Sequence, residues 1–84
     1  MKNNDAETVL TLIARILLTL KLQGPATQNK VAVYLNIDKR KVGKYIESLA
    51  KRRFIQSSEH KAGIVYRITS TGTTFADNLE ALMK

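Results

Sequence analysis

Residues 36–46 read NIDKRKVGKYI, a stretch that combines core-type side chains with four basic residues. Val42 and Ile46 stand one helical turn apart and Leu49 continues the spacing, so the three predict one buried helical face. The basic residues then fall on the other faces: Lys39, Arg40 and Lys44 largely on the outer one, and Lys41 near its edge. We therefore expect a helix over residues 39–52 that buries one side and presents positive charge on the other.

A second helix precedes this one across a short turn. Thr27 is suited to cap the segment QNKVAVYL, because a threonine oxygen accepts a backbone N–H of the first helical turn. Asn36 tolerates the left-handed conformation that ends a helix, and Asp38 can cap the helix that follows. In the helix QNKVAVYL, the side chains expected to point inward are Val31, Tyr34 and Leu35. Two helices joined by so short a turn have helix-turn-helix spacing, which predicts this motif over residues 27–52.

The remaining segments predict a helix before this motif, and a hairpin and a helix after it. Residues 6–22 carry apolar side chains at spacings of three and four until a Gly-Pro pair stops the helix, and residues 1–5 are expected to be flexible. Two β-like runs within residues 54–68 flank a linker that ends in glycine, which is typical of a hairpin. Thr69 is suited to cap a last helix over residues 70–83. The order predicts one α+β domain, mainly α, with three helices, a two-stranded β wing and a C-terminal helix.

The composition narrows the class of protein. The chain has 84 residues, 44% of them hydrophobic, which suits one small globular domain. It has no cysteine and one histidine, so we expect no disulfide, no metal site and no cofactor. Paired carboxylates and a Gly-rich phosphate loop are both missing from the sequence, so an enzyme is not expected. The polar N-terminus does not resemble a signal peptide and the apolar run is interrupted by charge, which predicts a cytoplasmic protein without a membrane span.

Positive charge is concentrated in the middle of the chain. The formal net charge is +7, and residues 27–68 hold ten basic residues against three acidic ones, so this segment carries the whole excess. A basic surface confined to one segment indicates a polyanionic partner, of which nucleic acid is the commonest. A merely solubilising face is the alternative interpretation of the charge alone.

The order of elements and a set of spaced residues resemble the winged helix-turn-helix DNA-binding domains, especially small archaeal ones. The positions that carry the first part of the resemblance are Gly24, Thr27, Gln28, Val42, Tyr45, Ile46, Leu49, Phe54 and Ile55. The most specific part is the ending Y-x-I-T-x-x-G, formed here by Tyr66, Ile68, Thr69 and Gly72. The resemblance covers about residues 20–80. It implies binding to double-stranded DNA, usually as a dimer, in transcription regulators or in chromatin-associated proteins of the nucleoid.

In a helix-turn-helix the second helix enters the major groove with its N-terminal end. Arg40 then has the chemistry to bind a guanine through two hydrogen bonds, and the neighbouring lysines suit phosphates. Gly43 leaves room either for a DNA strand or for a tight contact with the preceding helix. The residues expected to contact DNA are Thr27, Gln28, Asn29, Lys30, Lys39, Arg40, Lys41, Gly43, Lys44, His60, Lys61 and Arg67.

The helix over residues 6–22 is apolar over a wide arc, so it is either wrapped by its own domain or packed against a second copy, and we favour a homodimer. The archaeal relatives often dimerise through a long terminal helix, whereas the last helix is short here. The residues expected in the interface are Val9, Leu12, Ile16, Leu18, Leu79, Leu82 and Met83. A second departure is Arg53, which stands where the family commonly has a helix-ending glycine; an arginine in the left-handed conformation costs about 1 kcal/mol.

Three functions fit these observations. The first is a dimeric DNA-binding transcription regulator, most simply a repressor. The second is an architectural DNA-coating protein with weak sequence preference, because lysines dominate the basic helix. The third is a winged-helix protein-interaction module whose basic face meets an acidic partner. No small-molecule ligand is expected, because without a second domain a sizeable pocket has no place to form except at a dimer interface.

Overall fold

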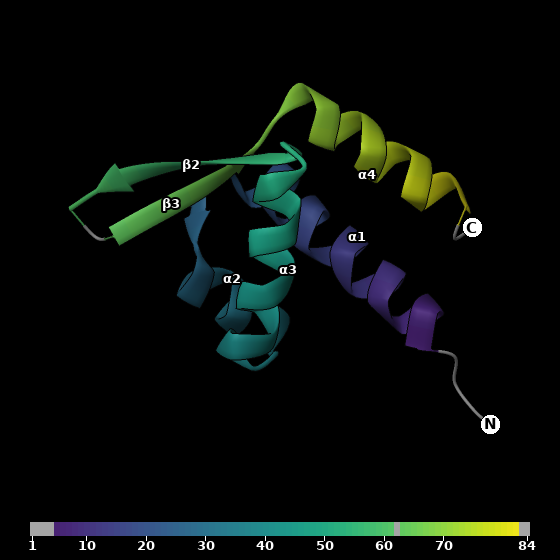
Figure 1. The fold of residues 1–84 in the computed structure, drawn as a ribbon, viewed down its shortest axis with the longest axis horizontal. Coiled ribbons are helices and arrows are strands. Elements are labelled where there is room, and N and C mark those ends of the chain that lie inside the picture. The colour runs from purple at the N-terminus through teal and green to yellow at the C-terminus, as the bar shows by residue number, and fades with distance from the viewer. Residues whose placement is uncertain (1–4, 62, 83–84) are drawn as a thin grey trace.

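Four helices and three short strands make up the described part of the computed structural model, residues 5–61 and 63–82, with side chains described from residue 9 (Figure 1). The elements in chain order are α1 (Asp5–Gln23), β1 (Ala26–Thr27), α2 (Gln28–Leu35), α3 (Lys39–Lys51), β2 (Ile55–His60), β3 (Gly63–Ile68) and α4 (Ser70–Leu82). This order confirms the predicted mainly helical α+β fold with its helix-turn-helix, α2–α3, and its wing, β2–β3. Of residues 1–5, expected to be flexible, 1–4 lie outside the described residues and Asp5 begins α1.

Both helices of the motif are capped as predicted, α2 by Thr27 and α3 by Asp38 at the turn that joins them. The Thr27 hydroxyl accepts the Lys30 N–H at 3.1 Å, and an Asp38 carboxylate oxygen accepts the Arg40 N–H at 3.1 Å. Asn36 ends α2 with φ 58°, in the left-handed region. The N–H of Ile37 then bonds to the Ala32 carbonyl at 3.0 Å, and the partly buried Ile37 side chain packs on the core. These bonds fix how α3 leaves α2.

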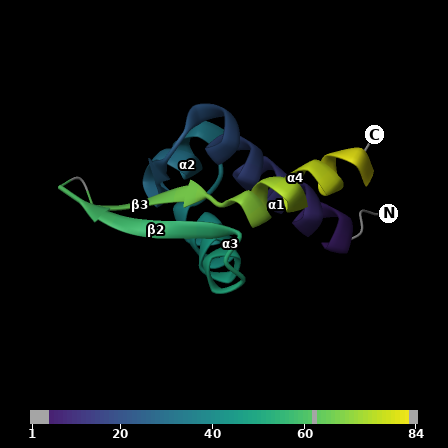
Figure 2. The same ribbon diagram turned by 90° about the horizontal axis from the view of Figure 1, so that it is seen from above.

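The core lies between α1 and the helix-turn-helix. Figure 2 shows α1 running beside α4 toward the middle of the molecule, where it contacts α2, α3 and β3. Its most deeply buried side chains are Leu12, Ile16, Leu17 and Leu20. From α2, α3 and β2 the core receives Val31, Leu35, Val42, Ile46, Leu49 and Ile55. The predicted inward face of α3 is therefore confirmed. Among the helices of the described residues, none is both long enough and apolar enough to cross a bilayer.

Tyr34, which the sequence predicts to point inward, lies at the surface, and so does Leu10 of α1. Leu10 shares a face with buried residues of α1 but is 44% exposed, because the N-terminal turns of α1 extend beyond the helix-turn-helix (Figure 1). Tyr34 is 58% exposed, whereas Ala32 is buried in α2. The small Ala32 brings the other edge of α2 against the core, and the Tyr34 hydroxyl accepts a hydrogen bond from Gln23 at 2.7 Å instead.

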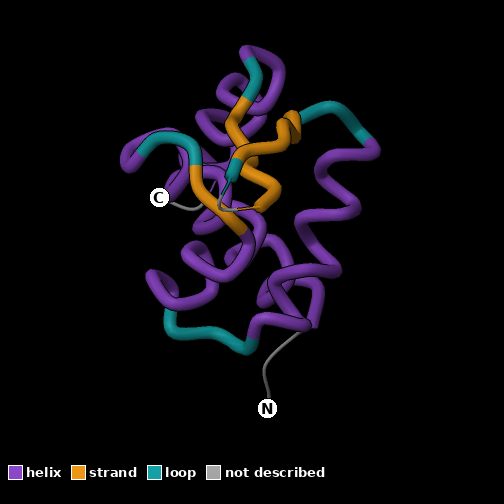
Figure 3. Tube along the Cα trace, turned by 90° about the vertical axis from the view of Figure 1, so that its left-hand side faces the viewer, coloured by secondary structure: helices purple, strands orange, loops and turns teal. Residues whose placement is uncertain are grey.

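The three strands form one antiparallel sheet in the order β1-β3-β2. Residues Ile55 and Ile68 pair at its inner end, and His60 and Gly63 pair at the hairpin tip. Figure 3 views the molecule from the side toward which the hairpin projects, with the strands in orange among the helices. The sequence predicts the hairpin but not β1, in which Ala26 pairs with Tyr66. Two residues are too short for an alternating pattern to be visible.

Thr69 joins the end of α3, the hairpin and α4. Its N–H bonds to the Phe54 carbonyl at 3.0 Å, and its hydroxyl lies 2.8 Å from the Arg53 carbonyl oxygen and accepts the Gly72 N–H at 3.0 Å. Arg53 has φ 65°, so it adopts the left-handed conformation despite the cost that this conformation carries for an arginine. Phe54 stacks on Phe75 of α4, with ring centroids 4.4 Å apart. A Cβ at Gly72 would clash with the Phe54 carbonyl oxygen, so the T-x-x-G ending fixes α4 against the base of the wing.

Replacing Gly72 by alanine should lower the free energy of unfolding by about 2–3 kcal/mol, because the added methyl meets backbone atoms that cannot move independently. Urea unfolding followed by circular dichroism measures this. Thr71→Ala, at an exposed position in the same turn, is the control and should change stability by no more than about 0.5 kcal/mol. Equal effects of the two substitutions would contradict the role given to Gly72.

Candidate nucleic-acid interface

The side of α3 that faces away from the core is basic and exposed. Opposite the buried Val42, Ile46 and Leu49 runs a stripe at spacings of four, three and four, called here the outer stripe: Arg40, Lys44, Glu47 and Lys51. All four of these side chains are exposed, and so are Lys39 and Lys41. The first two turns of α3 therefore hold four cations away from the core, in the arrangement that the sequence predicts.

The beginning of α2 lies beside the beginning of α3. The Gln28 side-chain amide donates to the Lys39 carbonyl at 3.2 Å. A Cβ at Gly43 would lie 2.6 Å from Gln28 Nε2, so the glycine makes room for this side chain. Of the two roles that the sequence allows for Gly43, the contact with the preceding helix is therefore formed. Asn29 and Lys30 are exposed next to Gln28, while the Thr27 hydroxyl is used in the cap.

An open groove of about 500 Å³ separates α3 from the hairpin and is called here the wing groove. Arg40, Lys44 and Glu47 line it from α3. Ser57 and Tyr66, which are paired across β2 and β3, line it from the wing. None of Glu47, Ser57 and Tyr66 is among the residues that the sequence predicts at the interface. The seven-residue spacing from Arg40 is a signal that points to Glu47, whereas the two wing residues depend on the strand register.

The hairpin extends from the helices as an arm (Figure 1). His60 ends β2 and Lys61 follows in the turn, so both lie at the predicted tip, and both are exposed. The His60 Nε2 lies 3.2 Å from the Ser58 hydroxyl oxygen. Arg67 is exposed on β3, where a guanidinium nitrogen is 3.5 Å from Gln56 Oε1 of the neighbouring strand. The wing thus adds two cations and a histidine to those of α3.

Several residues expected at a dimer interface are instead part of the core. Leu12, Ile16 and Leu79 are 6%, 0% and 5% exposed, because α1 is surrounded by α2, α3, α4 and β3. The prediction that these three form an intermolecular face is therefore wrong, and its alternative, a helix wrapped by its own domain, holds for them. The other predicted positions that are described keep some exposure, Val9 and Leu18 partly and Leu82 at 80%. Met83 lies outside the described residues.

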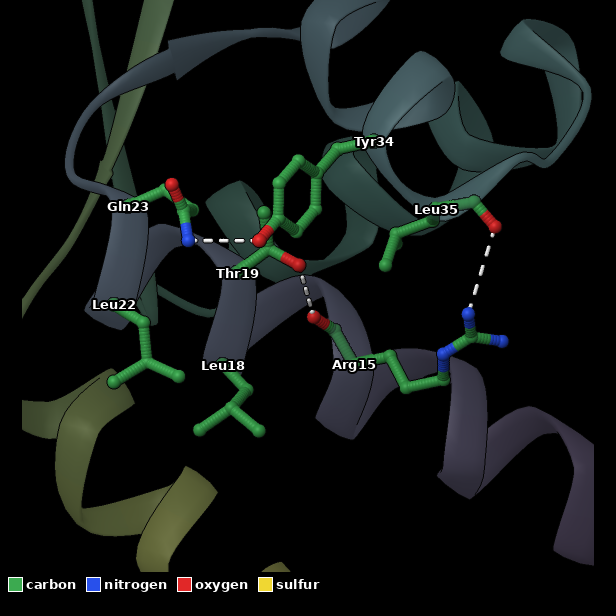
Figure 4. Close-up of a pocket in the computed structure, with 7 residues that line it drawn as sticks. All are labelled: Arg15, Leu18, Thr19, Leu22, Gln23, Tyr34 and Leu35. Carbon is green, nitrogen blue, oxygen red and sulfur yellow. Dashed lines mark hydrogen bonds between the residues drawn. The ribbon is translucent and has the colours of Figure 1, made fainter.

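A small apolar pocket of about 170 Å³ lies between α1 and α2 (Figure 4). Leu18, Leu22 and Leu35 contribute to its lining. Polar groups at the pocket bond to the chain itself: the Thr19 hydroxyl donates to the Arg15 carbonyl at 2.7 Å, and the Arg15 guanidinium to the Leu35 carbonyl at 3.5 Å. Its volume is below the range of roughly 300–1,000 Å³ that is usual for small-molecule sites.

Solved structures share this fold. The adhesin competence repressor AdcR of Streptococcus pyogenes matches with a TM-score of 0.74 and 23% identity, over 86% of this chain and 55% of that one. Bordetella bronchiseptica BpsR, whose DNA binding is regulated by 6-hydroxynicotinic acid, matches with a TM-score of 0.76 and 23% identity, over 83% and 51%. E. coli MarR matches with a TM-score of 0.77 and 14% identity, over 83% and 54%.

These matches establish a winged-helix fold like that of MarR and confirm the resemblance to winged helix-turn-helix domains. The chain spans about half the length of each of those proteins. No protein-family model and no curated protein matches the sequence. The special likeness to archaeal members stays a prediction.

The contact between Gly43 and Gln28 gives a double-mutant prediction. Glycine in a helix interior is about 1 kcal/mol less favourable than alanine, so Gly43→Ala should stabilise the protein by about that amount when Gln28 is also alanine. With Gln28 present, the gain should be mostly lost, because the methyl displaces the amide from the Lys39 carbonyl. Urea unfolding of the four proteins in the cycle measures the coupling. A gain that is the same in both backgrounds would contradict the contact.

Proposed function

We propose that this protein is a dimeric regulator of transcription, a repressor, that binds double-stranded DNA on the cytoplasmic nucleoid and acts without a cofactor. The observation that carries the proposal is the set of four exposed cations on the first two turns of α3, beside an open groove and a basic wing. Positive charge on one face of a helix-turn-helix is the electrostatic footprint of nucleic-acid binding.

In the proposed complex α3 lies in the major groove and the wing follows the backbone or the minor groove. Arg40, at the N-terminal end of α3, binds a guanine through its O6 and N7 atoms. Lys39, Lys41 and Lys44 bind phosphates, which fix the register of the protein on the duplex. The flanking contacts come from α2 and from the wing: Thr27, Asn29, Lys30, His60, Lys61 and Arg67. Gln28 holds the two helix ends together rather than reading bases, because its amide is bonded to Lys39.

The fold comparisons support a regulator. AdcR is a repressor and BpsR has a regulated DNA-binding activity, and both share the winged helix of this chain at the identities given above. In each case the match covers more than four-fifths of this chain.

The proposed dimer interface is built from the exposed ends of α1 and α4. Figure 1 shows the N-terminal end of α1 and the C-terminal end of α4 at one end of the 44 Å long axis and the hairpin tip at the other. Leu82 is 80% exposed and Leu10 is 44% exposed, with Val9 and Leu18 partly accessible. Lys21 and Asp77 join the two helices through a 2.7 Å ion pair, and its hydrogen bond raises the pKa of Lys21. A dimer formed at this end leaves α3 and the wing free.

An architectural DNA-coating role is the second candidate. Three of the four cations at the start of α3 are lysines, which bind phosphates and contribute affinity that does not depend on sequence. The two functions differ in the specificity ratio, measured by competition between a selected duplex and random duplex at fixed salt.

Arg40→Ala and Lys44→Ala should separate readout from phosphate binding. We expect Arg40→Ala to reduce the preference for the selected duplex by about 1–3 kcal/mol, because the guanine contact is lost. Lys44→Ala should weaken binding to all duplexes alike and lower the slope of log affinity against log salt by about one unit. Fluorescence anisotropy over a salt series measures both effects. Equal losses on selected and random duplex for both variants would contradict this division.

Leu82→Glu should weaken self-association by at least about ten-fold, because it places a charge in the proposed interface. Val33→Glu is the matched control, since Val33 is 72% exposed on α2, outside the proposed interface. Sedimentation velocity over a concentration series measures the association of both variants. A Leu82→Glu protein that dimerises as tightly as the control would show that the interface lies elsewhere.

A further inference from the structure

Glu47 places a negative charge in the middle of the basic surface. It is exposed on the outer stripe, one turn after Lys44 and two turns after Arg40, and it lines the wing groove together with them. Within the described residues, the structure gives Glu47 no ion pair with Lys44 or Lys51, whereas Lys21 and Asp77 do form one. The carboxylate is thus free to meet whatever occupies the groove.

A carboxylate at this position is unfavourable for a surface that binds only the phosphate backbone. It repels phosphates and offsets part of the attraction of the neighbouring cations. The opposite wall of the groove supplies Ser57 and Tyr66, which carry no positive charge to balance it. An acceptor of this kind becomes favourable where it meets a hydrogen-bond donor on a base edge, and in the major groove the amino group of cytosine is such a donor.

The distance along α3 places Glu47 over a different base pair from Arg40. Seven residues of α-helix span about 10 Å, and stacked base pairs rise about 3.4 Å each, so the two side chains stand about three base pairs apart. Gly43, which lies between them, has no side chain, and the space beside it is occupied by the Gln28 side chain from α2. The two long side chains therefore reach into the groove at separate positions.

We propose that Glu47 is a specificity-determining residue whose carboxylate accepts a hydrogen bond from a cytosine amino group about three base pairs from the guanine bound by Arg40. The inference rests on the proposed function, since it assumes that α3 enters the major groove. The Glu47 carboxylate would also disfavour other sequences, because a duplex without cytosine at that position leaves this desolvated carboxylate unpaired.

Selection of duplexes from a random pool tests the proposal. The wild-type protein is compared with Glu47→Gln, which removes the charge, and with Glu47→Ala, which removes the acceptor. Glu59→Gln is the matched control: it makes the same charge change at another exposed glutamate of the basic segment, on β2 near the hairpin tip. Affinities for the selected and the random duplexes are then measured at one salt concentration.

We expect the wild-type winner to contain a fixed cytosine about three base pairs from a fixed guanine. Glu47→Ala should lose the cytosine and reduce the ratio of selected to random affinity by about ten-fold. Glu47→Gln should exchange cytosine for adenine, which glutamine binds through N6 and N7. Glu59→Gln should keep the wild-type winner and tighten binding to all duplexes by one common factor.

Two other results overturn the inference in distinguishable ways. If the Glu47 variants select the wild-type winner and behave as Glu59→Gln does, Glu47 is only a solvated charge, while the proposed function stands. If the wild-type protein binds no duplex at physiological salt, the proposed function fails and this inference fails with it.

Discussion

The burial of one face of α3 against the rest of the domain is the constraint on which the interface depends. Val42, Ile46 and Leu49 are between 0% and 3% exposed, so rotating α3 about its axis would expose apolar surface worth several kcal/mol. The rotation of the helix fixes where every other side chain points. Arg40, Lys44 and Glu47 are outward because the three apolar residues are inward. The outward placement of these charged side chains is thus a consequence of core packing.

The position of the wing relative to α3 has a separate origin. Arg53 and Phe54 turn the chain from α3 into β2, and Thr69 holds this turn from the other end of the hairpin through hydrogen bonds to both carbonyls. Gly72 allows α4 to approach the Phe54 carbonyl closely. The wing groove therefore has two walls that are fixed by different parts of the chain, the core on one side and the Thr69 junction on the other.

Local signals in the sequence were sufficient for the four helices, the hairpin and the caps at Thr27, Asn36, Asp38 and Thr69, because each cap depends on one residue and its neighbours. Thr27, Asn36, Asp38 and Thr69 all act as their chemistry predicts. Contacts between distant segments were harder to predict from the sequence. The burial of Leu12 and Ile16 depends on how many elements surround α1, and a wide apolar arc alone does not separate that case from a dimer.

The candidate interface could likewise be predicted only in part from the sequence. The four cations of α3 follow from helical spacing, whereas the use of Gln28 to join α2 and α3 depends on a distance between two helix ends. Ser57 and Tyr66 belong to the groove only through the strand register. The outward position of Glu47 follows from its seven-residue spacing from Arg40, whereas the groove that it lines and the uncharged opposite wall depend on the tertiary structure.

The most direct measurement is a titration of the isotope-labelled protein with duplex DNA, followed by amide chemical shifts in NMR spectra. We expect the largest changes in the first two turns of α3, at the start of α2 and along the hairpin, with little change in the C-terminal half of α4. Changes concentrated on α1 and α4, with α3 unaffected, would contradict the claim that the outer stripe and the wing groove form the DNA-binding surface.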